Sequence, residues 1–324
     1  MLKTYLINTF KILVAALLIG WLLKSGKLDL KLIAQLKDHL WEVSCAVIFS
    51  VLNLVLVSFR WQGILKARSG ANIPLLGILK VTWIGQFFSS VLPGSVSGDL
   101  VKMLYIQKYD GTLTKKFVFA SILIDRVMGL SALIMLVGLS SLFFSSHILE
   151  NAPAMKPLLE TNYILAAIVI TGLLVFFFAH DPIRKILQMF QKRFMPKVWE
   201  KIIVLFDDLT SIKPQILKAV FISFIVQFLG VIVFWSLIYP FVGGKMDFVQ
   251  ALAFIPLGLM TLALPVAPSG LGVGHAIFQK LFEYSGIDNG ASLFNLYFVL
   301  TLSVNVMGVI PYLLSKGSNE LKKK

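Results

Sequence analysis

Long, nearly unbroken apolar runs are the feature that most constrains how this chain folds. Apolar residues fill these runs continuously, unlike the periodic stripe of a soluble helix, and only 14% of the 324 residues are charged. Most runs have the ~20 residues that a helix needs to cross a ~30 Å hydrocarbon core. We therefore expect an all-α polytopic membrane protein with about six spans. The predicted spans are Tyr5–Leu23, Trp41–Phe59, Phe117–Phe144, Tyr163–Ala179, Ile216–Tyr239 and Leu293–Leu314.

Two segments interrupt apolar sequence with residues that break helices. Leu92–Asp99 reads LPGSVSGD, and Leu264–Gly272 reads LPVAPSGLG. A broken helix at membrane depth leaves backbone N–H and C=O groups unpaired, and such backbone survives only inside protein or beside a water-filled cavity. Each segment is therefore predicted to form the tip of a re-entrant helical hairpin. The alternative is that Pro and Gly only kink closely packed helices, as small residues do in membranes.

The two segments also form a weak internal repeat, for which chance matching in apolar sequence is the alternative. The aligned pairs include Pro93 with Pro265, Ser97 with Ser269, and Gly98 with Gly270. Three predicted spans separate the segments, and an odd number of spans inverts orientation. The first hairpin should therefore enter from the cytoplasm and the second from outside, giving the inverted-repeat core that transporters use.

Helix N-termini at the hairpin tips are candidate sites for an anion such as a lipid phosphate. Their unpaired N–H groups and the positive end of the helix dipole favour negative charge, and glycine permits close backbone approach. The candidate substrate-binding residues of the tips are Pro93, Gly94, Ser97, Gly98, Pro265, Ser269, Gly270 and Gly272.

Four charged residues lie in apolar surroundings, where an ionisable side chain is costly unless it is paired or hydrated. Asp99 follows the first broken segment, and Lys102 lies about one helical turn further on the same face. Asp125 and Arg126 are adjacent within a predicted span, so they should find partners on other helices. All four are candidate headgroup contacts. The alternatives are a structural interhelical ion pair or snorkelling toward the cytoplasmic edge.

His275 follows the second broken segment, where it could exchange a proton or bind a headgroup, although a lone histidine is more often a satisfied polar group. The single cysteine, Cys45, permits neither an intramolecular disulfide nor a cysteine metal cluster. We predict no catalytic residue, no cofactor and no metal site.

The distribution of Lys and Arg predicts the orientation in the membrane. Basic residues collect between Asp181 and Lys218 and in the tail Lys322–Lys324, so both should be cytoplasmic. The N- and C-termini are then both predicted to lie on the cytoplasmic side of a cell membrane. The stretch 181–213 is predicted to be a basic amphipathic helix on the cytoplasmic interface. The net charge of +14 favours contact with anionic lipids rather than nucleic acid, because the chain has no aromatic-interleaved basic module outside its spans.

Three motifs, taken together and in order, give the chain a family resemblance. They are LPGSVSGDLVK at Leu92–Lys102, DRVMGL at Asp125–Leu130, and LPVAPSGLGVG at Leu264–Gly274. Over nearly its whole length the chain resembles the flippase-like transmembrane region of the lysylphosphatidylglycerol synthase family. One departure is the dipeptide Gly274-His275, which stands where the family often has Arg-Glu after Gly-Leu-Gly-Val.

The resemblance implies a lipid flippase or scramblase that moves an aminoacyl-phospholipid, another phospholipid or a polyprenyl-linked lipid. In bifunctional members a cytosolic domain attaches the amino acid before this region flips the lipid. Only Lys316–Lys324 follow the last predicted span, so we expect a single membrane domain, 1–324, without synthase activity.

Other functions remain open at this point. A membrane enzyme would need an acid, base and nucleophile or a metal cluster, and Asp207-Asp208 reads as an isolated solvated pair. An accessory protein of a lipid- or glycan-modifying enzyme and a secondary transporter of a small anion are the remaining alternatives. The expected partners are membrane lipids with anionic or charged headgroups, and a homo-oligomer is left open.

Overall fold

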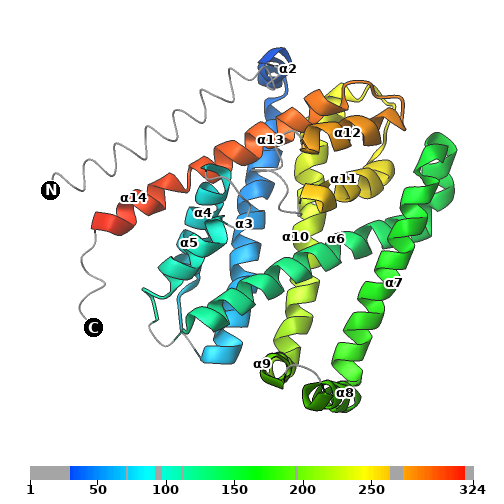
Figure 1. Cartoon of the computed structure of the whole chain (residues 1–324). Coiled ribbons are helices and arrows are strands. Elements are labelled where there is room, and N and C mark those ends of the chain that lie inside the picture. Colours follow the sequence, from blue (N-terminus) through cyan, green and yellow to red (C-terminus); the bar gives the residue numbers. More distant parts are fainter. Residues whose placement is uncertain are drawn as a thin grey trace.

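The chain is an all-α membrane protein, shown as a computed structural model in Figure 1. The structure describes residues 30–70, 72–91, 97–110, 113–193, 196–262 and 273–317, and within these it contains helices and no strand. The helices are α2 (Leu30–Gln35), α3 (Leu40–Ser69), α4 (Leu75–Val91), α5 (Ser97–Ile106), α6 (Lys115–Asn151), α7 (Lys156–Phe178), α8 (His180–Arg193), α9 (Pro196–Ser211), α10 (Lys213–Ile238), α11 (Phe248–Leu262), α12 (Val273–Glu283), α13 (Gly290–Val306) and α14 (Val309–Gly317), with short 3-10 turns at Leu36–Asp38, Pro153–Met155 and Tyr239–Phe241.

Five stretches of the described residues are long and apolar enough to cross a membrane. Each contains one of the predicted spans almost entirely, while the predicted span Tyr5–Leu23 lies outside the described residues. The five stretches are Leu40–Ala67, Lys115–Asn151, Pro153–Phe178, Lys213–Phe241 and Gly290–Ser315. The polytopic membrane fold is therefore confirmed.

Helices α3 and α10 form an antiparallel pair at the centre of the molecule. Asn53 donates a hydrogen bond to the carbonyl of Val226 (2.8 Å), and Gln215 near the start of α10 lies against Gly63 near the end of α3. In Figure 1, α6 crosses this pair at a steep inclination. The end where α3 finishes and α10 begins is thus one end of the molecule, and α8 and α9 lie there too.

Two pairs of short helices flank the predicted hairpin tips. Helices α4 and α5 have 17 and 10 residues, and α11 and α12 have 15 and 11, so each is shorter than a full span. The members of each pair pack against each other. Because α4 follows the end of α3 and α11 follows the end of the antiparallel α10, the two pairs start from opposite ends of the molecule (Figure 1). This agrees with the predicted opposite orientation; the linking residues 92–96 and 263–272 lie outside the described residues.

Aromatic rings hold the second pair against the central helices. Phe278 of α12 stacks on Phe294 of α13 with ring centroids 5.1 Å apart, and Phe234 of α10 lies 4.7 Å from Phe278. All three rings are fully buried. Glycine makes room for them, because a Cβ on Gly258 would overlap the Phe278 ring.

The first pair is held together by a close backbone approach of two glycines. A Cβ on Gly98 of α5 would overlap both the Gly85 carbonyl oxygen of α4 and the Ser89 hydroxyl. A Cβ on Gly85 would meet the aliphatic part of Lys102 at 2.6 Å. Only glycine therefore allows α4 and α5 to pack at this distance.

Substituting Gly98→Ala should destabilise the protein by about 1–3 kcal/mol, the usual effect of overpacking a tight contact. The effect is measured as a drop in apparent Tm, which is determined by size-exclusion chromatography of samples heated to a series of temperatures. Gly172→Ala is the matched control, because a Cβ there meets nothing within 4 Å and alanine favours helix. Equal melting of the two variants would contradict the close approach.

The basic stretch predicted as one interfacial helix, 181–213, is two helices. Helices α8 and α9 pack against each other, Phe190 stacks on Trp199 at 5.1 Å, and Arg184 pairs with Asp207 at 3.1 Å. The prediction that Asp207 is isolated was therefore wrong. Exposed apolar side chains on the pair suit contact with a membrane surface. They include Ile186, Met189, Val198 and Val204.

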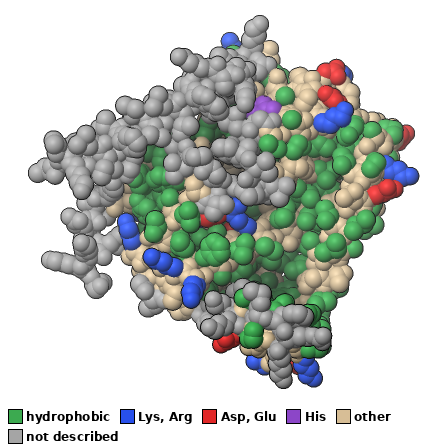
Figure 2. Space-filling model, in the orientation of Figure 1, with side chains coloured by type: hydrophobic (Ala, Val, Ile, Leu, Met, Phe, Trp, Pro, Cys, Tyr) green, Lys and Arg blue, Asp and Glu red, His purple; other side chains and the backbone are tan. Residues whose placement is uncertain are grey.

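Figure 2 shows apolar side chains over the middle of one face, with Lys and Arg along its left and lower edges and others beside acidic side chains at the upper right. The exposed apolar residues of α6 and α7 belong to such a surface, which suits contact with the hydrocarbon of a membrane. Examples are Phe143, Ile164, Ile168 and Phe178, with exposed fractions between 63% and 84%.

Candidate functional site

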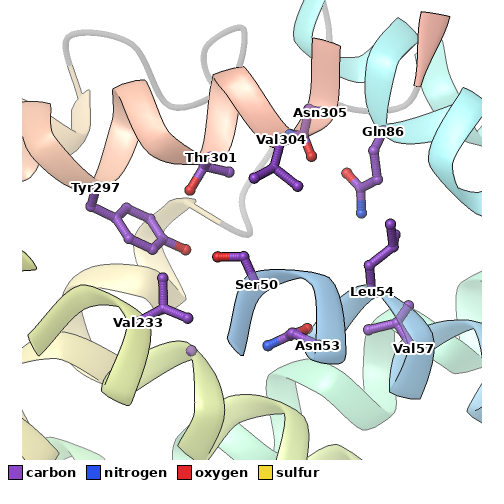
Figure 3. Close-up of a pocket in the computed structure, with 11 residues that line it drawn as sticks. Ser50, Asn53, Leu54, Val57, Gln86, Val233, Tyr297, Thr301, Val304 and Asn305 are labelled. Atoms are coloured by element: carbon purple, nitrogen blue, oxygen red, sulfur yellow. The ribbon is translucent and has the colours of Figure 1, made fainter. Parts of the chain in front are cut away.

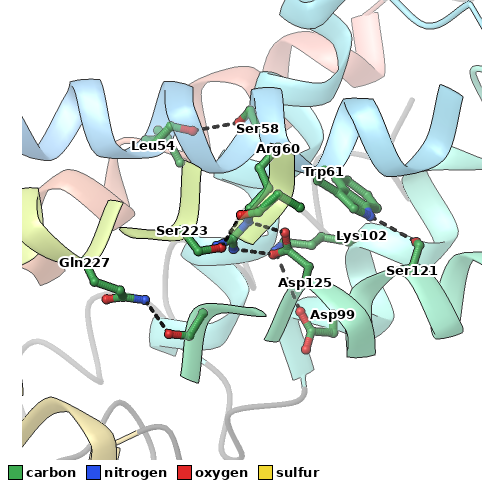
Figure 4. A network of polar contacts seen from close by, with 12 residues as sticks. Leu54, Ser58, Arg60, Trp61, Asp99, Lys102, Ser121, Asp125, Ser223 and Gln227 are labelled. Carbon is green, nitrogen blue, oxygen red and sulfur yellow. Dashed lines mark hydrogen bonds and ion pairs between the residues drawn. The ribbon is translucent and has the colours of Figure 1, made fainter. Parts of the chain in front are cut away.

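A buried ion pair joins α3 to α6 within the membrane-spanning part of the molecule (Figure 4). The Arg60 guanidinium donates from Nε and Nη2 to both carboxylate oxygens of Asp125, at 2.7 and 2.9 Å. Its Nη1 donates to the Ser223 hydroxyl of α10 at 2.6 Å, and that hydroxyl donates onward to the Ala219 carbonyl. The bidentate pair thus links three spanning helices.

The sequence around the pair explains why it is tolerated at this depth. At 1.5 Å per residue, Arg60 lies about 13 Å along α3 from Ser69, and Asp125 lies about 15 Å along α6 from Lys115. Gly129 lies beside this pair, and its carbonyl accepts a hydrogen bond from Gln227 of α10. Pairing and hydrogen bonding satisfy charges that would otherwise be costly there.

A second group of charges lies beside this pair, where α5 meets α6. Arg126 Nε donates to Asp99 Oδ2 at 2.6 Å, and Lys102 Nζ is 3.7 Å from Asp99 Oδ1. Lys102 also lies over the Trp61 ring, 5.7 Å from its centroid, and the Trp61 indole donates to Ser121. Asp99, Lys102 and Arg126 are called the α5–α6 charge cluster below.

The prediction that Asp125 and Arg126 have partners on other helices is confirmed. So is the expectation that Asp99 and Lys102 share a helix face. The two arginines differ in access, since 5% of the Arg60 side chain is exposed and 39% of the Arg126 side chain. Asp125 therefore has the structural interhelical role that the sequence left open, whereas Arg126 can offer donors to an incoming oxygen.

The α5–α6 charge cluster lies about two to three helical turns from the connection between α5 and α6. Asp99 is about 11 Å along α5 from Ile106, and Arg126 is about 16 Å along α6 from Lys115. Arginine presents several donors in a rigid fork that matches carboxylate and phosphate oxygens. The cluster thus combines both charge signs on two neighbouring helices of the membrane protein.

Ser97 and Gly98 begin α5 directly before this cluster. The Ser97 hydroxyl donates to the Phe88 carbonyl of α4 at 3.3 Å, so it helps close the helix pair. Asp99 already supplies negative charge in the first turn of α5, as the helix dipole favours. Phosphate binding at this N-terminus stays a prediction. Of the other candidates, Pro93, Gly94, Pro265, Ser269, Gly270 and Gly272 lie outside the described residues.

His275 lies on α12, in the other pair of short helices, and not on α5 or α6 with the charge cluster. Its Nε2 shares a short hydrogen bond with Asn295 Oδ1 of α13, and its ring packs edge-on against Phe294 at 4.9 Å. This contact fits the satisfied polar group that the sequence left as an alternative. A role in headgroup binding stays a prediction.

A polar cavity lies between α3, α4, α10 and α13, near the middle of the spanning helices (Figure 3). Its volume is about 190 Å³. Asn53, Gly230 and Thr301 line it, and each is close to the midpoint of its apolar stretch. Sequence reasoning predicted a polar midplane cavity but assigned it other residues, since none of the predicted site residues lines this one.

Arg60 and the cavity residues are what the sequence analysis missed. The signal for Arg60 was present, because apolar sequence continues past it through Trp61, Ile64 and Leu65. A mid-span Asn53 was a similar signal. Among the described residues, no group of three or more His, Cys, Asp or Glu side chains is arranged to hold a metal ion.

Comparison with known proteins identifies related sequences. The model of the family described as the lysylphosphatidylglycerol synthase TM region matches residues 8–306. The chain is also similar to the UPF0104 membrane protein PH1989 of Pyrococcus horikoshii, with 20% identity over 311 residues that cover 90% of each protein. No solved structure matches the chain.

Proposed function

Because the chain belongs to the family of the lysylphosphatidylglycerol synthase TM region, we propose that it moves a lipid with a polar or charged headgroup between the two leaflets. The family relates the chain to lipid biosynthesis or transport, which is the reason for choosing a lipid as cargo. We propose no catalytic step. The basic end that carries α8 and α9 is assigned to the cytoplasm, following the excess of Lys and Arg there.

The observation that carries the proposal is the α5–α6 charge cluster. The Arg126 side chain is 39% exposed, against 5% for Arg60, so an incoming group can reach Arg126. Asp99 has two cationic neighbours, Arg126 at 2.6 Å and Lys102 at 3.7 Å. The cluster therefore carries an excess positive charge where α5 meets α6.

This geometry suggests how a headgroup binds without leaving any charged side chain unpaired. A phosphate that approaches Arg126 takes over its donors, while Asp99 remains paired with Lys102. When the headgroup also carries a cation, that cation binds the Asp99 carboxylate as the phosphate takes its place at Arg126. Each step replaces one ion pair with another, which keeps the cost of charge at this depth low.

Reconstitution into liposomes tests the proposal. Lipids with a fluorescent acyl chain are placed in both leaflets, and albumin extraction or dithionite quenching reports the fraction that reaches the outside. We expect faster exchange in protein-containing vesicles than in empty vesicles. Exchange no faster than in empty vesicles, by protein that elutes as a single folded species, would overturn the proposal.

The same experiment separates the remaining alternatives. An accessory protein would leave exchange at the background rate and co-purify with an enzyme. A transporter of a small anion would move a soluble anion across vesicles whose lipids stay in their leaflets. Both outcomes contradict lipid movement as the activity of this chain.

A further inference from the structure

The midplane cavity is lined by hydrogen-bonding groups that carry no charge. Its polar side chains come from three helices, two of which cross the membrane, and they end in hydroxyl or amide groups (Figure 3). They are Ser50, Asn53, Gln86, Tyr297, Thr301 and Asn305. At about 190 Å³ the cavity is several times the ~30 Å³ that one water occupies in the liquid. It is therefore large enough for a group of several heavy atoms.

Part of this hydrogen-bonding capacity is unused within the protein. No hydrogen bond in the described part of the chain engages the side chains of Ser50 or Gln86. Asn53 and Asn305 use their amide N–H groups on Val226 and Ser90, which leaves their carbonyl oxygens as acceptors. In Figure 3 the Tyr297 hydroxyl and the Ser50 side chain point into the same space. Donors and acceptors thus face one another across it.

The absence of ionised groups in the lining selects the kind of ligand. A phosphate or an ammonium group would lose its hydration here without a counter-charge, which is costly. Hydroxyl groups donate and accept, so they match a lining that carries both amide and hydroxyl side chains. A polyol fits this chemistry better than any charged group.

The cavity is also placed to act together with the charged residues. Asn53 and Arg60 are two helical turns apart on α3, so they share a face and are about 10 Å apart along its axis. Arg60 itself is occupied by Asp125, and Arg126 of the α5–α6 charge cluster is the next residue after Asp125. The cavity and the cluster are therefore neighbours, so one headgroup can place its neutral part in the cavity and its charged part at the cluster.

We propose that this cavity binds the uncharged, hydroxyl-rich part of a lipid headgroup, a glycerol or a sugar. The inference deepens the proposed lipid movement and rests on it for the choice of a lipid. It assigns the cavity to the selection of the headgroup, whereas the α5–α6 charge cluster receives its charge.

Lipid retention measured by native mass spectrometry tests the assignment without relying on transport. Purified protein is titrated with glucosyl-diacylglycerol, phosphatidylglycerol and phosphatidylcholine of matched acyl chains. We expect both hydroxyl-bearing lipids to be retained more strongly than phosphatidylcholine. Gln86→Leu and Ser50→Ala should each weaken that preference about 2- to 10-fold, as expected for one lost hydrogen bond.

Ser303→Ala is the matched control, because the Ser303 hydroxyl bonds its own helix at Val299 and does not line the cavity. Its lipid preference should equal that of the wild type. If Gln86→Leu does not fold, Ser50→Ala still tests the lipid preference, because Ser50 lies on a different helix, α3. Equal retention of the three lipids, or an unchanged preference in folded Gln86→Leu or Ser50→Ala, overturns the assignment.

Methyl glucoside as a free competitor identifies the source of the hydroxyl groups. We expect it to compete only weakly, because it lacks the acyl chains that hold a lipid at the membrane. Displacement of glucosyl-diacylglycerol at an equal concentration would overturn the lipid assignment in favour of a soluble polyol. Selective retention in protein that moves no lipid would refute the proposed transport and support the cavity assignment. Lipid movement without selective retention would support the proposed transport and refute the cavity assignment.

Discussion

Replacing Arg60 with methionine will lower the free energy of unfolding by about 3–5 kcal/mol, because it leaves the Asp125 carboxylate buried without its partner. The substitution removes both hydrogen bonds to Asp125 and the one to Ser223. Methionine keeps most of the side-chain volume, so the loss comes from the charge rather than from a cavity. Unfolding in mixed micelles with increasing SDS measures it.

The double variant Arg60→Met/Asp125→Leu is the control for this prediction. Removing both charges leaves no unpaired group, and buried ion pairs are often replaced by apolar residues at little cost. The double variant should therefore recover most of the lost stability. If it is as unstable as Arg60→Met, or if Arg60→Met unfolds like the wild type, the pair does not bind α3 to α6 as described.

Charge removal at the α5–α6 charge cluster will have the largest effect on lipid movement. Asp99→Asn and Arg126→Gln are each expected to slow leaflet exchange about 10-fold or more, the scale of a lost charge-assisted hydrogen bond. Asparagine keeps the shape of the Asp99 side chain, and glutamine at position 126 keeps a polar but shorter side chain. Exchange in proteoliposomes gives the rates. Lys102→Gln should slow exchange less, because Lys102 is the more distant neighbour of Asp99.

Arg184→Gln is the matched control, because it removes an arginine–aspartate pair of similar geometry outside the spanning helices. Exposed pairs of this kind contribute little to stability. We expect Arg184→Gln to exchange lipids at the wild-type rate. Equal slowing by Arg184→Gln and Arg126→Gln would show that any lost arginine impairs the protein, and it would remove the cluster from the pathway.

Much of the fold could be predicted because a membrane-spanning helix is defined by a continuous stretch of sequence. Length and continuity of apolar sequence determine a span, and five of the six predicted spans correspond to helices in the described residues. The short helices on either side of each Pro/Gly segment could be predicted too, because Pro and Gly interrupt a helix within a short stretch of sequence. Two interfacial helices in place of one, α8 and α9, were missed, because apolar spacing alone does not show where a helix turns back.

The site was only partly predictable for a different reason. A charge in an apolar run shows that a partner must exist, and this was enough to expect interhelical partners for Asp125 and Arg126. It does not show which helix supplies the partner, so Arg60 was not identified. The cavity was harder still, since its polar residues come from helices far apart in the chain, and each alone resembles an ordinary interhelical hydrogen-bond partner. Asn305, which bonds Ser90 of α4, is an example.

The most direct test of lipid passage through this molecule is a cryo-EM reconstruction in nanodiscs that contain phosphatidylglycerol and glucosyl-diacylglycerol, at a resolution that shows headgroups. We predict headgroup density at the depth of the spanning-helix midpoints, within hydrogen-bond distance of Arg126 or of the cavity side chains, with acyl chains extending into the bilayer. Lipid density confined to the two annular leaflets, with Arg126 and the cavity both sealed from them by protein, would contradict it.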